Sequence, residues 1–290
     1  MDWRRSRQSD NVEQTGTASR PGRGGGRLSL GGVAILVAVG LAMGRSPTEI
    51  LGVLVSMNGN GGATTTAPTR PNTAEQNEQV QFVRSILGST EDTWAEVFAS
   101  AGQQYPAPKM IVFQGAVQSA CGHASSAMGP FYCPGDQQVY LDLDFFREME
   151  QQIHASGDLA RAYVIAHEVG HHVQNVLGSM GKVDQARRRG ATMEGAEGLS
   201  VRQELQADCY AGIWAKRAEQ RLRWLEPGDI ESALAAASAI GDDALQRATR
   251  GQVMPDSFTH GSSAQRVRWF KTGLASGELS DCDTSAPAAL

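Results

Sequence analysis

The sequence lacks the excess of basic side chains that is typical of nucleic-acid-binding proteins. It has 290 residues, with 26 Lys and Arg against 31 Asp and Glu, and a formal net charge of −5. A phosphate backbone attracts surfaces rich in Lys and Arg. We therefore expect no nucleic acid among the partners of this protein.

Long apolar runs are also scarce. The exception, residues 28–44, has seventeen residues without a charge. As a helix it would span about 25 Å, slightly less than the ~30 Å hydrocarbon core of a bilayer. A transmembrane helix, a cleaved signal sequence and a buried core helix are the alternatives. The missing polar stripe and the long preceding segment favour an uncleaved transmembrane helix.

Charge is distributed unevenly around this run. Residues 1–27 are rich in Gly and contain six Arg against three acidic residues. By the positive-inside rule we expect this basic segment to be cytoplasmic and the domain that follows the run to lie outside the cytoplasm. Residues 45–73 are expected to form a juxtamembrane segment and linker, and residues 74–290 one folded domain. We thus expect a single-pass protein of the cell membrane, with the lipid bilayer as a partner.

Cysteine is rare. The four cysteines all follow the apolar run, and they are Cys121, Cys133, Cys209 and Cys282. No C-x-x-C pair is present, which argues against a zinc site made of thiolates. In an oxidising compartment Cys121 would pair with Cys133 and leave Cys209 for Cys282. Alternatively, Cys209 is a small buried side chain.

The apolar spacing in residues 74–290 predicts an α+β fold that is mainly helical with a small sheet. The expected helices cover residues 75–87, 91–101, 145–153, 159–177, 199–225, 228–241 and 263–274. The expected strands are the apolar runs 109–113 and 138–143. Polar, Gly-punctuated stretches at 119–136 and 179–198 are expected to be loops.

The most informative motif is an H-E-x-x-H sequence that runs from His167 to His171. Residues i and i+4 share one face of a helix, so both histidines can bind one metal ion. Glu168 can then reach the metal-bound water and act as general base. His172 points about 100° away from His171 and is expected to be exposed or to support a ligand. The alternative is a helix whose histidines pack in the core or face water.

A catalytic zinc site needs a third protein ligand. Gln174 and Leu177 stand where a metzincin has Gly and His, which excludes that class. Glu204, on the next long helix, is our candidate. Asp208 lies four residues further on the same face, where its carboxylate can accept the second N–H of a ligating histidine. A solvated helix face is the alternative for this pair of acids.

Several motifs together resemble the putative neutral zinc metallopeptidase family of bacteria, single-pass membrane proteins related to the gluzincins. The matching residues are 9–13, 121–122, 129–134, 167–172, 204–214 and 259–266. The resemblance implies a zincin-like metallopeptidase fold with one Zn²⁺ on His167, His171 and Glu204. It also implies that Glu168 is the catalytic base.

His260 and Arg266 are further candidates. Peptide hydrolysis builds negative charge on the carbonyl oxygen, and either side chain would stabilise it. Related gluzincins have a T-H-P-x-x-x-x-R segment here, whereas this sequence has Gly261 in place of Pro. The alternative for His260 is a surface histidine before a helix N-cap. Residues 138–143 resemble the strand that borders the cleft of zincins, where an extended substrate can pair.

The expected function is therefore that of a membrane-anchored, zinc-dependent peptidase. Its substrate would be a protein or peptide, hydrolysed by a metal-activated water with a glutamate as general base. One alternative is a zinc-containing membrane scaffold that binds partner proteins without turnover. A more remote alternative is a metal-free helical domain.

Overall fold

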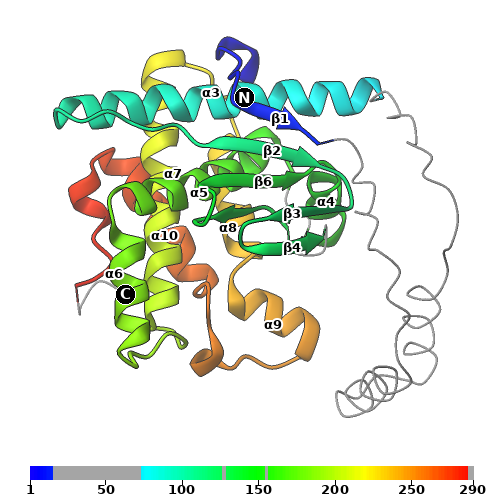
Figure 1. The fold of residues 1–290 in the computed structure, drawn as a ribbon. Coiled ribbons are helices and arrows are strands. Elements are labelled where there is room, and N and C mark those ends of the chain that lie inside the picture. Colours follow the sequence, from blue (N-terminus) through cyan, green and yellow to red (C-terminus); the bar gives the residue numbers. More distant parts are fainter. Residues whose placement is uncertain (16–72, 126–128, 154–155, 287–290) are drawn as a thin grey trace, which may run out of the picture. The chain divides into compact units, whose positions relative to one another are not determined.

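A computed structural model describes residues 1–15, 73–125, 129–153 and 156–286. These residues belong to one compact unit with an α+β fold, mainly helical with a small mixed sheet (Figure 1). The apolar run at 28–44 and nearly all of the expected linker lie outside the described residues. Among the helices that the structure describes, none has the length and apolarity needed to cross a bilayer.

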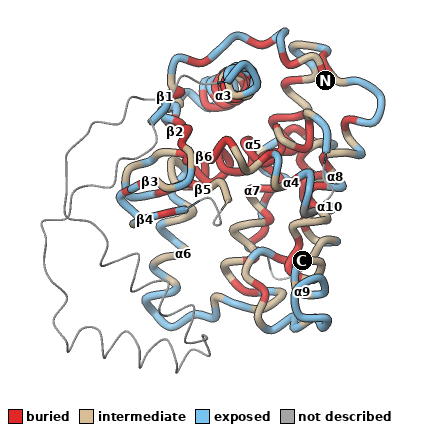
Figure 2. Tube along the Cα trace, turned by 90° about the vertical axis from the view of Figure 1, so that its right-hand side faces the viewer, coloured by how far each residue is buried: buried red, intermediate tan, exposed pale blue. Residues whose placement is uncertain are grey.

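Most of the expected helices are confirmed. The helices are α3 (Ala74–Ser100), α4 (Phe145–Ile153), α5 (Asp158–Val176), α6 (Ser179–Arg188), α7 (Leu199–Leu222), α8 (Asp229–Ala239), α9 (Asp242–Arg250) and α10 (Ser263–Ser276). The prediction of a loop over 179–198 is wrong, because α6 occupies its first half. No residue of α6 is buried, so its sequence has no apolar stripe to reveal it (Figure 2). Helix α9 was also not expected.

Helix α3 is one continuous helix where two were expected, at 75–87 and 91–101. The expected break between residues 87 and 91 is wrong. A Cβ atom on Gly88 would lie 2.5 Å from the carbonyl oxygen of Arg7. Glycine at this position permits a close approach of the N-terminal segment and does not mark a helix end.

The main sheet has the strand order β1 (Val12–Gln14), β2 (Lys109–Phe113), β6 (Gln138–Asp142) and β5 (Phe131–Cys133). Strands β1, β2 and β6 are parallel, and β5 is antiparallel to β6. A separate antiparallel hairpin consists of β3 (Ala116–Ser119) and β4 (Gly122–Ser125). Both expected strands are confirmed, but 119–136 is not a loop, because it contains β4 and β5.

The side chains of β2 and β6 alternate between two apolar clusters, as the twofold period of a strand requires. One face joins the main core, which the helices share, through Met110, Val112, Val139 and Leu141. The other face packs with residues of the β3–β4 hairpin through Ile111, Phe113 and Tyr140. Behind the first face, helices α5, α7, α8 and α10 pack against one another (Figure 1).

Residues 1–15, here called the N-terminal segment, form part of this body. The amino group of Met1 lies 3.0 Å from a carboxylate oxygen of Glu226 and 2.9 Å from one of Asp229. Strand β1 completes the sheet edge beside β2. The folded body thus includes a segment that the expected boundary at residue 74 leaves out.

The buried carboxylate of Glu91, on α3, holds the N-terminal segment. It accepts hydrogen bonds from the hydroxyl of Ser9 at 2.6 Å and the amide of Asn11 at 2.7 Å, and it pairs with Arg7 at 2.6 Å. The N-terminal segment and α3 therefore belong to one folded unit.

We expect Glu91→Gln to lower the free energy of unfolding by about 2 kcal/mol, because Arg7 loses its buried partner and one acceptor oxygen becomes a donor. Glu96→Gln, on the exposed face of α3, is the matched control and should cost less than about 0.5 kcal/mol. Urea denaturation of the full chain measures both. Equal effects of the two substitutions would contradict the role of Glu91.

Candidate metal centre

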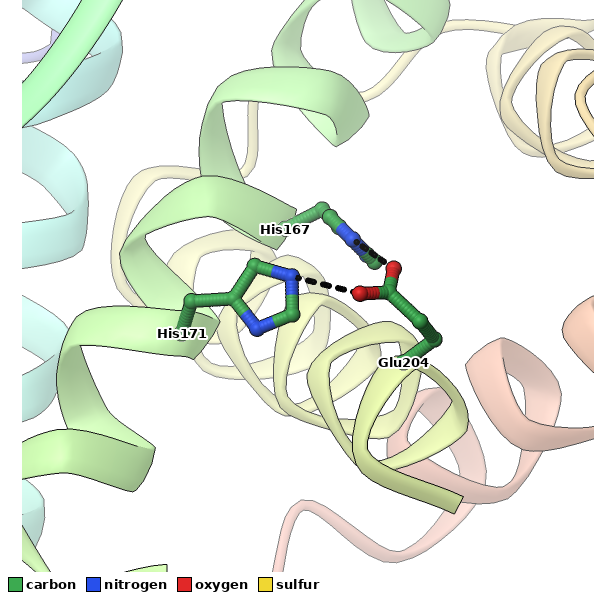
Figure 3. A group of neighbouring side chains, drawn as sticks. All are labelled: His167, His171 and Glu204. Atoms are coloured by element: carbon green, nitrogen blue, oxygen red, sulfur yellow. Dashed lines mark hydrogen bonds and ion pairs between the residues drawn. The ribbon is translucent and has the colours of Figure 1, made fainter. Parts of the chain in front are cut away.

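Two helices bring three potential metal ligands together. His167 and His171 lie one turn apart on α5, and Glu204 faces them from α7 (Figure 3). The Nε2 atom of His167 is 3.1 Å from one carboxylate oxygen of Glu204, and that of His171 is 3.3 Å from the other. The potential ligand atoms all lie within 4.8 Å of one another. Both histidines are buried.

This donor set fits zinc. Four-coordinate zinc takes imidazole nitrogen and carboxylate oxygen at about 2.0–2.2 Å, which sets neighbouring ligand atoms roughly 3.4 Å apart. The His167–Glu204 and His171–Glu204 separations are close to that value. Three protein ligands leave a fourth position open, which is the composition of a catalytic rather than a structural zinc site.

A second carboxylate orients His167. Asp208, one helical turn beyond Glu204 on α7, has no exposed surface, and its Oδ1 lies 2.8 Å from Nδ1 of His167. The buried guanidinium of Arg266, on α10, donates to both oxygens of Asp208 at 2.9 and 3.0 Å. The hydroxyl of Tyr163 donates to the same carboxylate. Bonding through Nδ1 leaves Nε2 of His167 directed at Glu204, the position needed for a ligand.

Gln174 performs the corresponding task for His171. Its side-chain oxygen accepts a hydrogen bond from Nδ1 of His171 at 2.9 Å. Its amide nitrogen donates to the backbone oxygen of Gln203 at 2.7 Å, next to Glu204. Gln174 therefore fixes one ligand and joins it to the helix of another. From the sequence alone, Gln174 indicated only that the protein is not a metzincin, and this role was not predicted.

The charges of the three potential ligands affect one another strongly. Burial by itself lowers the pKa of His167, but Asp208 and Glu204 raise it to about 10. Burial also lowers the pKa of His171, which Glu204 raises above its ordinary value. In return, the two histidines hold the pKa of Glu204 well below its usual range, although burial raises it. These interactions favour a charged carboxylate on Glu204 and the protonated form of His167, whose proton a bound cation can replace.

The three ligands face a cleft of about 420 Å³. Glu168 lines this cleft, and burial raises the pKa of its carboxyl group, which the two histidines offset only in part. Strand β5 forms one border through Phe131 and Tyr132. The expectation that residues 138–143 border the cleft is wrong, because β6 lies inside the sheet and β5 is the edge strand.

His260 also lines the cleft, and Asp242 holds it in place. Nδ1 of His260 lies 3.2 Å from one oxygen of Asp242, and this hydrogen bond raises the pKa of the imidazole. The other oxygen accepts the backbone N–H groups of Thr259, His260 and Gly261 at 2.7 to 3.0 Å. The loop is therefore tied down without a proline. Sequence reasoning missed Asp242, which begins the unexpected helix α9.

His172 does not reach the metal ligands. It is buried, its Nε2 donates to the carbonyl oxygen of Pro106 at 2.6 Å, and its Nδ1 accepts from the hydroxyl of Tyr132 at 3.1 Å. The same hydroxyl accepts a hydrogen bond from Asn175. These contacts tie helix α5 to the edge strand β5. His172 is thus neither exposed nor in contact with a ligand.

The four cysteines form two disulfides in the expected pairing, Cys121–Cys133 and Cys209–Cys282. The first joins the β3–β4 hairpin region to β5 beside the cleft. The second joins α7, the helix of Glu204, to the C-terminal end of the described chain.

Comparison with known proteins identifies the family. The model of the putative neutral zinc metallopeptidase family matches residues 1–285. The chain belongs to this family. The match begins at residue 1, so it includes the N-terminal segment.

Relatives occur in distant bacteria. The uncharacterized protein YpfJ of Escherichia coli K12 is 44% identical over 289 residues, which cover 98% of each chain. The uncharacterized protein Rv2575 of Mycobacterium tuberculosis is 44% identical over 220 residues, 72% of this chain and 73% of that protein. No solved structure gives a significant match.

We expect zinc binding at neutral pH to release about one proton from His167. The reason is that its pKa is about 10 in the metal-free site, whereas a ligating imidazole is neutral. The affinity for zinc should therefore rise about tenfold per pH unit as the pH rises toward that value. Calorimetric titration in buffers of different ionisation enthalpy measures the number of protons.

The matched variants are Asp208→Asn and Asp184→Asn. The first removes the carboxylate that raises the pKa of His167, so fewer protons should be released. It also removes the hydrogen bond that orients His167, so zinc should bind about 10 to 100 times more weakly. The second changes an acid on α6 that does not touch the site and should leave both values unchanged. Identical proton release in all three proteins would contradict this account.

Proposed function

We propose that the protein is a zinc-dependent peptidase with a zincin-like catalytic body. The observation that carries this proposal is the convergence of His167, His171 and Glu204 at the border of a cleft that also contains Glu168. Each histidine is oriented by a hydrogen bond to its second ring nitrogen, as is usual for metal ligands. Zinc, when bound, would polarise the scissile carbonyl and lower the pKa of a water molecule.

Glu168 would act as general base and then as general acid. It neighbours His167 in sequence and lines the same cleft. Burial raises the pKa of its carboxyl group, which brings proton uptake closer to neutral pH. The carboxylate would take a proton from the attacking water and deliver it to the leaving amine.

His260 would stabilise the negative charge that develops on the carbonyl oxygen. It is half exposed to the cleft, and Asp242 favours its protonated, donating form. Arg266 also lines the cleft, but both oxygens of Asp208 hold its guanidinium. We assign Arg266 the role of neutralising Asp208 and fixing its position.

The edge strand β5 would bind the substrate backbone. Among the strands that the structure describes, it pairs with β6 alone, so its other edge can accept an extended chain. Phe131 and Tyr132 of this strand lie in the cleft with the metal ligands. A polypeptide segment bound in this way is recognised mainly through its backbone, which favours unfolded proteins and peptides as substrates.

The test is peptide hydrolysis by the full chain loaded with zinc. We expect the wild type to cleave an unfolded protein, and Glu168→Gln to reduce the rate by about 10² to 10⁴ while zinc content stays at one ion per chain. Glu148→Gln, on α4 outside the cleft, is the control for loss of an acid. Equal hydrolysis by wild type and Glu168→Gln would reject Glu168 as base, and no hydrolysis by either would reject the peptidase activity.

For the location, we propose that the body and the N-terminal segment lie together outside the cytoplasm, attached to the membrane through residues 28–44. The two disulfides favour an oxidising compartment. The contacts of Met1 and Glu91 support a location of the N-terminal segment on the same side as the body. This proposal replaces the single crossing with a cytoplasmic N-terminus.

A membrane-impermeant maleimide tests the topology in spheroplasts. We expect Gln8→Cys in the N-terminal segment and Gln185→Cys on α6 to be labelled equally without lysis, because both positions are exposed and on one side. Labelling of Gln185→Cys in intact spheroplasts, with Gln8→Cys labelled only after lysis, would contradict the proposal.

A further inference from the structure

A second hollow adjoins the catalytic cleft. Its volume is about 510 Å³, within the range of ligand-binding sites. Met180 and Gln203 line both the cleft and this hollow. Gln203 directly precedes Glu204 in α7. A chain bound at the metal ligands can therefore continue into the second hollow without leaving the protein surface.

The same chain segment borders both cavities. Phe131 and Tyr132 of β5 line the cleft, and Pro134 and Gly135, which follow at once, line the second hollow. The Cys121–Cys133 disulfide holds this border, and Cys121 itself lies in the wall. An extended chain that pairs with the free edge of β5 would run from one cavity toward the other.

Helix α6 forms another part of the wall. It contributes Met180, Gly181 and Val183, yet no residue of the helix is buried (Figure 2). The helix thus adds little to the core. Its side chains instead help to enclose the hollow.

The lining of the hollow favours an apolar side chain. Met180, Val183 and Met193 supply apolar surface, and methionine adapts to ligands of different shape. The charges at the wall are Asp184 and Arg187, which pair with each other. No acid or base in the lining is left to select a charged ligand, among the residues that the structure describes.

We propose that this hollow is a substrate subsite, which binds an apolar side chain of the polypeptide whose scissile bond lies at the metal ligands. The proposal rests on the proposed peptidase function. It identifies the substrates as extended polypeptides that are long enough to fill both cavities. Short peptides that reach only the cleft lack this contact.

Gly181→Trp tests the subsite. A Cβ atom on Gly181 meets no atom within 4 Å, so a larger side chain can enter the hollow without displacing the backbone. Lys182→Trp is the matched control, because Lys182 points about 100° away on the helix and does not line the hollow. Val183→Lys is a second variant, which introduces a charge in place of an apolar side chain.

Binding is measured by fluorescence anisotropy on the zinc-loaded, full-length Glu168→Gln protein, which gives a readout without turnover. The probes are a labelled leucine-rich decapeptide and a labelled tetrapeptide of the same composition. We expect the decapeptide to bind at least about tenfold more tightly than the tetrapeptide. Gly181→Trp and Val183→Lys should remove this advantage, and Lys182→Trp should keep it.

The possible outcomes distinguish failure of the subsite from failure of the proposed peptidase function. Equal binding of the two peptides, or an unchanged advantage of the decapeptide in Gly181→Trp and Val183→Lys, would overturn the subsite. If wild-type protein still cleaves both peptides in that case, the proposed peptidase function stands. If the zinc-loaded wild type cleaves neither peptide, the peptidase function fails and the subsite fails with it.

Discussion

The arrangement of the site depends on one buried carboxylate, Asp208. It lies where α5, α7 and α10 meet and has no contact with solvent. A buried charge without partners would be strongly destabilising, so the fold must supply them. The partners are His167, Tyr163 and Arg266, one or more from each neighbouring helix. The same bonds that satisfy Asp208 orient a metal ligand and dock α10.

This network requires α7 and α10 to lie unusually close. A Cβ atom on Gly273 of α10 would be 1.9 Å from the backbone oxygen of Cys209 on α7, and Gly212 faces α10 with a similar lack of space. Glycine at both positions lets the helix backbones touch, which brings Arg266 within reach of Asp208. The second disulfide joins Cys209, at this contact, to Cys282, which follows α10.

The sequence predicts those parts of the site that follow local rules. The spacing of His167 and His171 is a property of any helix, and the need for a third ligand led to Glu204. The roles of Gln174 and Asp242 were not predictable in this way. Gln174 matters because α7 lies beside it, and Asp242 because a loop eighteen residues later folds back onto its carboxylate. Strand β5 and helix α6 were missed because one is only three residues long and the other buries nothing.

The place of the N-terminal segment in the fold also could not be predicted from local sequence rules. Glu91 looks like a solvated acid on a helix until Ser9 and Asn11, some eighty residues earlier, bond to it. The body is therefore discontinuous in the chain, and a fragment that starts at residue 74 would leave Glu91 without partners and expose the edge of β2. The family match from residue 1 is consistent with a segment that belongs to the fold.

Because β2 pairs with β6, and β6 with the edge strand β5, the N-terminal segment lies at the far side of the sheet that borders the cleft. Its contribution to the site is thus the support of that sheet.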